Sequence, residues 1–181
     1  MEKRELYNKN KEKTNEIILA TEEVPENRYI LVELALIQDT QGRILVQKRS
    51  EQKGGEFGLT SGHAKAGENS LQGMITEIKE ELGIDVQPHE LRLMHSERSD
   101  EKRRFYDLFY LQKDYNISEM ELQKEEVEDV MWLSKKEVET LCSKRNFKSE
   151  HIDAYEIITK KLKEREWCYA INSTMGCKWW M

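Results

Sequence analysis

The stretch from Leu71 to Leu82 constrains the fold more than any other part of the 181-residue chain. Its apolar residues recur at helical spacing and predict one buried face, made of Leu71, Met74, Ile75, Ile78 and Leu82. Asn69 or Ser70 is a suitable N-terminal cap, and Gly83 is typical of the residue that ends a helix. The sequence therefore predicts an amphipathic helix with defined ends that packs against a larger apolar surface.

Three glutamates lie on one side of this predicted helix. Glu77, Glu80 and Glu81 are spaced i, i+3 and i+4, so their carboxylates emerge within a single turn and repel one another. The ordinary interpretation of such a cluster is a solvated acidic face. Here Glu77 and Glu81 flank Ile78 and Leu82, so the cluster borders the buried face instead of opposing it. Hard oxygen ligands gathered in this way suit Mg²⁺ or Mn²⁺.

The segment GHAKAGENSLQGMITEIKEELGI, residues 62–84, resembles the Nudix box, whose pattern is G x5 E x7 R E U x E E x G U, with U a bulky aliphatic residue. Eight of the nine defined positions match: Gly62, Glu68, Glu77, Ile78, Glu80, Glu81, Gly83 and Ile84. The resemblance implies an α/β Nudix fold, in which a mixed β-sheet is sandwiched between α-helices. It also implies a Mg²⁺-dependent pyrophosphohydrolase that cleaves a diphosphate linkage in a nucleoside diphosphate derivative or a related small molecule.

The same resemblance implies roles for residues of the box. Glu80 and Glu81 would coordinate the metal, and Glu77 would be a further ligand or the base that helps to activate water. The carbonyl group of Ser61 is a candidate metal ligand. Supporting residues of the loop and the helix are Gly62, Glu68 and Gly83.

Substrate binding is expected from side chains around the glutamate cluster. Aromatic stacking and anion pairing predict a pocket lined by Arg49, Phe57, His63, Arg104 and Tyr106. Members of the family often recruit another acid from outside the box, and the candidates here are Glu125, Glu126 and Glu128. An exposed acidic turn is the alternative interpretation of these three residues.

Thr76 departs from the box, because the family has arginine at this position. That arginine normally orients the neighbouring glutamates by charge pairing, which a threonine cannot do. Lys79 and Lys65 are nearby candidates for a substitute cation. Without a substitute, metal binding or catalysis would be reduced, and the chain would be a catalytically weak Nudix binding module.

Isopentenyl diphosphate isomerase, which shares the Nudix fold, is the closest alternative enzyme. The region through Arg49 resembles isomerase-related Nudix proteins, and Ser61-Gly62-His63 stands where those isomerases have Cys-Gly-His. A serine hydroxyl is a poor proton donor and acceptor for that chemistry, because its pKa is far above that of a thiol. No histidine precedes His63, so the histidines of a His-rich metal site are also missing. The hydrolase is therefore favoured.

Patterns outside the helix predict strands on both sides of it. The apolar runs Tyr29–Ile37 and Arg43–Arg49 are joined by turn residues, which predicts a hairpin. Further strands and helices are expected at Leu91–Ser96, Phe105–Leu111, Val127–Leu133, Ser134–Cys142 and Ser149–Glu166. We expect an N-terminal arm that forms a small hairpin (residues 1–28), a Nudix domain (residues 29–166) and an irregular tail that contains tryptophans and cysteines (residues 167–181).

Composition argues against several kinds of partner. The formal net charge of −6 disfavours nucleic acid, because phosphate contacts need clustered lysine and arginine. No stretch approaches the roughly 20 apolar residues of a membrane span, and the charged start of the chain is unlike a secretory signal. Three cysteines without metal-type spacing predict reduced thiols and a cytoplasmic protein. The N-terminal arm and the tail are candidate homodimer contacts, whereas the sequence does not specify which diphosphate is the substrate.

Overall fold

The computed structural model describes residues 1–174, with side chains described through Glu164. At its centre is a mixed sheet with the strand order β5-β4-β3-β8-β7, in which β6 also pairs with β3, and β9 with β4. The strands of this sheet are β3 (Ile30–Gln38), β4 (Ile44–Arg49), β5 (Phe57–Gly58), β6 (Thr60–Gly62), β7 (Arg92–Ser99), β8 (Arg104–Gln112) and β9 (Val127–Leu133). The α-helices are α1 (Ser70–Leu82), α2 (Lys135–Ser143) and α3 (Ser149–Thr174).

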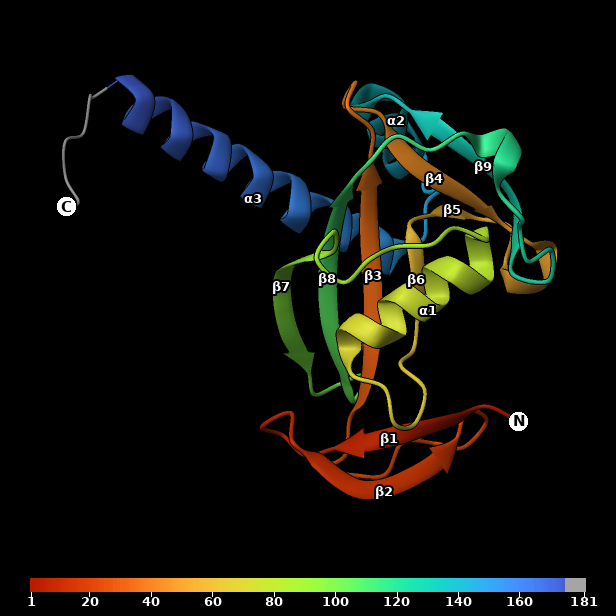
Figure 1. Ribbon diagram of the computed structural model, residues 1–181. Helices are drawn as coiled ribbons and strands as arrows, with labels where there is room; N and C mark the ends of the chain where they lie inside the picture. The colour runs from red at the N-terminus through yellow and green to blue at the C-terminus, as the bar shows by residue number, and fades with distance from the viewer. Residues whose placement is uncertain (175–181) are drawn as a thin grey trace.

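Helices cover both faces of the sheet, with α1 on one face and α2 and α3 on the other (Figure 1). On the α1 face, Met74 and Ile78 of the helix pack with Ala35 and Ile37 of β3. Because side chains alternate along a strand, the intervening residues of β3 point to the opposite face. The predicted sandwich of a mixed sheet between helices is confirmed.

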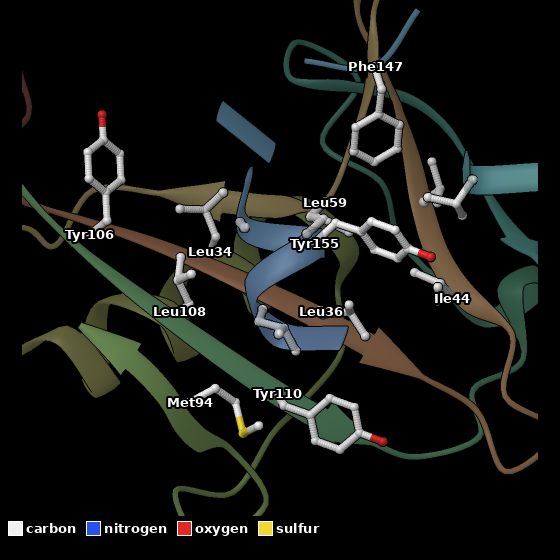
Figure 2. Close-up of a cluster of buried hydrophobic side chains, with 14 of the residues drawn as sticks. Leu34, Leu36, Ile44, Leu59, Met94, Tyr106, Leu108, Tyr110, Phe147 and Tyr155 are labelled. Carbon is white, nitrogen blue, oxygen red and sulfur yellow. The ribbon is translucent and has the colours of Figure 1, made fainter. Parts of the chain in front are cut away.

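The core on the opposite face fixes the beginning of α3 against the sheet. Figure 2 shows Leu34 and Leu36 of β3, Leu108 of β8 and Tyr155 of α3 in one cluster of buried side chains. Burial of one such side chain stabilises a fold by about 1.5 to 3 kcal/mol. This packing holds the first turn of α3, including Glu150, beside the middle of the sheet.

The β3–β4 pair differs from the predicted hairpin. Only Gln38 and Ile44, next to the turn, are paired across the two strands. Beyond the turn β3 pairs with β6 over Glu33–Ala35, and β4 pairs with β9 along its length. The prediction of a hairpin was wrong beyond the turn, because strands that come later in the chain occupy the edges that a local turn would pair.

The N-terminal segment forms a two-stranded antiparallel hairpin, β1 (Lys3–Tyr7) and β2 (Lys13–Leu19), at one end of the sheet (Figure 1). It is attached by two backbone hydrogen bonds, from the Tyr7 amide to the Tyr29 carbonyl at 2.8 Å and from the Tyr29 amide to the Tyr7 carbonyl at 2.9 Å. The side chains of Tyr7 and Tyr29 lie in a small buried cluster with Ala64 and Phe105. The hairpin therefore packs against both the sheet and the loop that precedes α1.

The C-terminal helix continues past the end expected from sequence. The predicted helix ends at Glu166, whereas α3 runs to Thr174, so the first part of the tail, residues 167–174, is helical. The remainder of that predicted irregular tail, residues 175–181, lies outside the described residues. Within residues 1–174, no helix combines the length and the apolar character that a membrane crossing requires.

Candidate active site

Local sequence signals fix both ends of α1. The Asn69 side chain accepts a hydrogen bond from the Gln72 amide at 2.9 Å, and the Gln72 side chain accepts one from the Asn69 amide at 2.9 Å. Gly83 ends the helix in the left-handed conformation with φ 72°, and its amide donates to the Lys79 carbonyl at 2.9 Å. These ends determine the register in which the helix presents its glutamates to the cleft.

Gly62 allows the loop before α1 to lie directly against Glu77. A Cβ atom at this position would come within 1.9 Å of Glu77 Cδ, so a larger residue would displace the carboxylate. The His63 amide donates to Glu77 Oε1 at 3.1 Å. Burial raises the pKa of Glu77 to about 7, and the neighbouring charge of Glu80 adds to the rise, whereas the His63 hydrogen bond opposes it. Gly62 at the end of β6 and the amide of the next residue, His63, thus position the first of the three glutamates.

Glu81 is the most buried of the three glutamates, with 4% of its surface exposed. The buried amide of Gln47, on β4, donates to Glu81 Oε2 at 2.8 Å and also lies 3.2 Å from Thr60 Oγ1. Burial raises the pKa of Glu81 to about 8; the Gln47 hydrogen bond opposes this effect, and the charge of Glu77 adds to it. The third glutamate, Glu80, is the most exposed of the three.

The three carboxylates stand side by side but do not converge on one point. Glu77 bonds to the His63 amide, Glu81 to Gln47, and Glu80 to Lys65. Accordingly, the described residues contain no preformed group of three or more acidic, histidine or cysteine side chains that would hold a metal ion. The donor chemistry still fits a divalent cation, because carboxylate oxygens from three residues of α1 line the same cleft and are the ligands that Mg²⁺ prefers.

Thr76 contacts Glu68 instead of the glutamate cluster. Its hydroxyl donates to Glu68 Oε1 at 2.7 Å, and Glu68 Oε2 accepts from the Lys65 amide at 2.9 Å. Lys65 Nζ pairs with Glu80, whereas Lys79 pairs with a carboxylate beyond the end of the helix at 2.9 Å. Of the two candidate substitutes for the box arginine, Lys65 therefore reaches the glutamates and Lys79 does not.

A cleft of about 230 Å³ opens beside the glutamates. The predicted residues that line it are Arg49, Ser61, Gly62, His63, Glu77, Glu80, Glu81, Arg104, Tyr106 and Glu126. They come from β4, β6, α1, β8 and the loop before β9, so the fold brings together most of the side chains proposed from sequence.

Five predicted site residues do not line this cleft: Phe57, Glu125, Glu128 and the supporting residues Glu68 and Gly83. Phe57 is half-buried against the core on the α3 face, with Lys48 Nζ 5.4 Å from its ring centre. Glu125 and Glu128 are exposed, and the carbonyl of Glu125 accepts from Ser50 Oγ at 2.6 Å. Among the candidate distal acids only Glu126 reaches the cleft, where it pairs with Lys53 at 2.6 Å.

The cleft is also lined by polar residues to which the sequence patterns assigned no role: Glu2, Arg4, Lys53, Gln123, Lys148, Glu150 and His151. His151, on α3, is 1% exposed, and its Nδ1 accepts a hydrogen bond from the Leu59 amide at 3.0 Å. Burial lowers the pKa of His151 well below its usual value, and Lys148 adds to the effect. No motif marked these residues, because they approach the glutamates only after the sheet has formed.

Glu33 lies behind the cleft on the central strand β3, between Gly62 of β6 and Asp107 of β8. Both Glu33 carboxylate oxygens are buried. Burial raises the pKa of Glu33 well above its usual value, and the charges of Asp107 and Glu77 add to the rise, whereas a backbone hydrogen bond from Ala64 opposes it. Asp107, unlike Glu33, has a cation as its partner: Lys11 Nζ from the hairpin donates to its two oxygens at 2.5 and 2.6 Å. The interruption of an apolar strand by Glu33 was a sequence signal for this buried acid.

Known proteins resemble this chain along most of its length. The profile of the NUDIX domain family matches residues 29–156. An uncharacterized Nudix hydrolase of Listeria monocytogenes is 34% identical over 151 residues, which cover 81% of this chain and 88% of that protein. A crystal structure from Deinococcus radiodurans is similar with a TM-score of 0.65 at 19% identity, over 78% of this chain and 89% of that one. The NUDIX domain of NrtR from Shewanella oneidensis, crystallised with ADP ribose, gives 0.60 at 17% identity, over 74% and 88% of the two chains.

Proposed function

The chain belongs to the Nudix family and is a Nudix hydrolase; from this premise we propose that it is a Mg²⁺-dependent pyrophosphohydrolase. Its substrate would be a nucleoside diphosphate derivative or a related small molecule that contains a diphosphate linkage. The observation that carries the proposal is the position of Glu77, Glu80 and Glu81 along one edge of a cleft that also contains several basic side chains. An acidic edge suits the metal, and basic side chains suit the phosphate groups.

Each glutamate has a distinct place in this proposal. Glu80 and Glu81 would hold the metal, and the carbonyl group of Ser61 on β6 is a further candidate ligand. Glu77, fixed by the His63 amide, would be a third ligand or the base for the attacking water. Bound Mg²⁺, or Mn²⁺, would neutralise the diphosphate and lower the pKa of a bound water.

Two observations favour hydrolysis over the alternatives. Ser61 lines the cleft at the position where the isomerases have a thiol, so the isomerase proton transfer has no suitable group there. Lys65 pairs with Glu80 and supplies a cation that the box arginine would otherwise provide, which argues against a weak binding module.

The partners and the location follow from the same proposal. We propose a small-molecule partner, with neither nucleic acid nor membrane as the target, and a cytoplasmic location. The half-buried Cys142 is a free thiol, which fits a reducing compartment. The N-terminal hairpin remains a candidate homodimer contact.

The test is a substrate panel with Mg²⁺ and product assignment by phosphorus NMR. The panel contains nucleoside triphosphates, nucleotide sugars, dinucleoside polyphosphates, isopentenyl diphosphate and ADP ribose, the last because it was crystallised with the NrtR domain. We expect cleavage of a diphosphate linkage in one class and loss of activity in EDTA. Glu80→Gln and Glu81→Gln should each lower turnover by about 100-fold or more, because charge stabilisation by the metal is worth several kcal/mol.

Stability measurements separate a catalytic defect from misfolding. Burial disfavours the charged form of Glu81, so Glu81→Gln should melt no lower than the wild type in EDTA. Glu139→Gln, an exposed change on α2, is the matched control and should leave turnover unchanged. A wild type that is inert across the panel, or a fully active Glu80→Gln/Glu81→Gln double variant, would contradict the hydrolase. Isomerised product without phosphate release would instead favour the isomerase.

A further inference from the structure

Three cations that are far apart in the chain line the same cleft. Arg4 comes from β1, Arg104 begins β8, and Lys148 directly precedes α3. Arg104 and Lys148 also share Glu150 as an ion-pair partner. We call these three residues the basic wall.

The basic wall is incompletely neutralised by nearby carboxylates. Arg4 Nε is 3.6 Å from Glu2, Arg104 is 3.6 Å from Glu150, and Lys148 Nζ is 4.0 Å from the same Glu150. Each of these separations exceeds that of a close charge-assisted hydrogen bond. Glu150 also accepts from Lys102 Nζ at 2.6 Å, so a single carboxylate is shared among three cations. An excess of positive charge therefore remains in this part of the cleft.

Two buried nitrogen atoms of the cleft have no hydrogen-bond partner in the described part of the chain: Arg4 Nε and His63 Nε2. The ring nitrogen of His63 is buried, lines the cleft and can donate a hydrogen bond to an anion. A buried donor without a partner costs free energy, which a bound oxyanion would recover.

The backbone holds Arg4 in place on both sides. The Ala66 amide donates to the Lys3 carbonyl at 2.8 Å, and the Gly67 amide lies 3.3 Å from the Glu5 carboxylate. These contacts tie β1 to the loop of the box, so the backbone that carries Arg4 is already fixed before a ligand binds.

We propose that the basic wall, together with His63, binds a phosphate group of the substrate independently of the metal. A phosphate matches the site better than a carboxylate does, because it carries more charge and offers acceptor oxygens in several directions. A diphosphate chain would then extend from the glutamates to the basic wall. The inference rests on the proposed function only in that it assigns this phosphate to the substrate.

The experiment measures binding without metal and therefore does not depend on catalysis. Inorganic pyrophosphate is titrated into the full-length protein in EDTA at low salt, and binding is followed by calorimetry. We expect the wild type to bind, and Arg4→Gln and Lys148→Gln each to weaken binding by about tenfold, the value of one charge-assisted hydrogen bond. Arg28→Gln, beside the same hairpin but outside the cleft, is the matched control and should bind as the wild type does. Acetate should not compete.

Two outcomes would overturn the inference. Wild-type affinity in both cleft variants would remove Arg4 and Lys148 from the site. Binding that appears only with Mg²⁺ would place the anion on the metal instead of the basic wall. Metal-free binding that is lost in Arg4→Gln, in a protein that hydrolyses nothing in the panel, would leave this inference intact while the proposed function fails.

Discussion

The acidic edge and the basic wall of the cleft are built in opposite ways. The glutamates of the acidic edge lie within five consecutive residues of one helix, Glu77 to Glu81, so local spacing alone brings them together. The residues of the basic wall, Arg4, Arg104 and Lys148, meet only through the pairing of β3 with β8 and the packing of α3 and the hairpin. A local motif therefore gathers the carboxylates of this cleft, whereas the tertiary fold gathers its cations.

The two sides of the cleft also differ in how they tolerate change. The acidic edge depends on close contact between α1 and the backbone of β6, where Gly62 leaves no room for a side chain. The basic wall depends on the attachment of a hairpin that Lys11 joins to the buried Asp107. We therefore expect substitutions at the acidic edge to act mainly on turnover, and substitutions in the hairpin to act on stability and substrate affinity.

Gly62→Ala should have the largest effect. The added Cβ would overlap the Glu77 carboxylate and displace it, and a misplacement of about 1 Å at a catalytic group costs roughly 100-fold in rate. Turnover measured on the best substrate of the panel should fall by about that factor, with a smaller change in KM. Wild-type turnover in Gly62→Ala would show that Glu77 moves freely and that the close packing of this loop is not required.

The contrast between the two sides of the cleft explains what the sequence predicts and what it does not. Asn69 and Gly83 delimit α1 through local hydrogen bonds, so the helix and its glutamates are readable from a few consecutive residues. The divergence of β3 from β4 is not readable in this way, because it depends on the competing partners β6 and β9. Arg4 and Lys148 belong to charged stretches that resemble any solvated surface. The prediction that Phe57 lines the pocket was wrong, because tertiary packing directs its side chain toward the core.

Lys11→Met should have the next largest effect and would weaken the attachment of the hairpin. It leaves Asp107 buried without its cation, and because Lys11 is 29% exposed we expect a loss of about 2 kcal/mol, below the range for fully buried pairs. Urea denaturation measures the loss, and KM should rise because Arg4 is on the same hairpin. Lys13→Met, which removes an exposed pair with Glu5, is the matched control and should cost at most about 0.5 kcal/mol. Equal losses in the two variants would mean that Asp107 does not anchor the hairpin.

Glu33→Gln should have a smaller effect that depends on pH. The pKa of Glu33 is raised by burial in the folded state, so its contribution to stability is fully present below the unfolded pKa and is lost as the pH rises through the folded pKa. The glutamine amide does not ionise, so the variant does not lose stability in this way. In EDTA the two proteins should be equally stable near about pH 4, and the variant should become more stable than the wild type as the pH rises, by up to about 1 kcal/mol. Thermal melts across the pH range measure the difference.

The control for this pH dependence is Glu101→Gln, an exposed change that should leave the melting curve unaltered at every pH. A constant difference between Glu33→Gln and the wild type would contradict the buried-charge explanation. It would also indicate that Glu33 is paired in solution.

Thr76→Arg should have the smallest effect. It tests whether the glutamates still need the arginine that the Nudix box has at this position. Lys65 already pairs with Glu80, so the new guanidinium would add a second cation, and we expect turnover equal to the wild type or higher by at most about threefold, well under 1 kcal/mol. Thr76→Val is the control: it removes the hydroxyl that donates to Glu68 and should cost about 1 kcal/mol of stability with little change in turnover. A sharp loss of turnover in Thr76→Arg, without a loss in Thr76→Val, would mean that the loop and helix around Thr76 and Glu68 are arranged differently from those of a box that contains arginine. In that case even the acidic edge, the side of the cleft most readable from sequence, would depend on contacts that the motif does not encode.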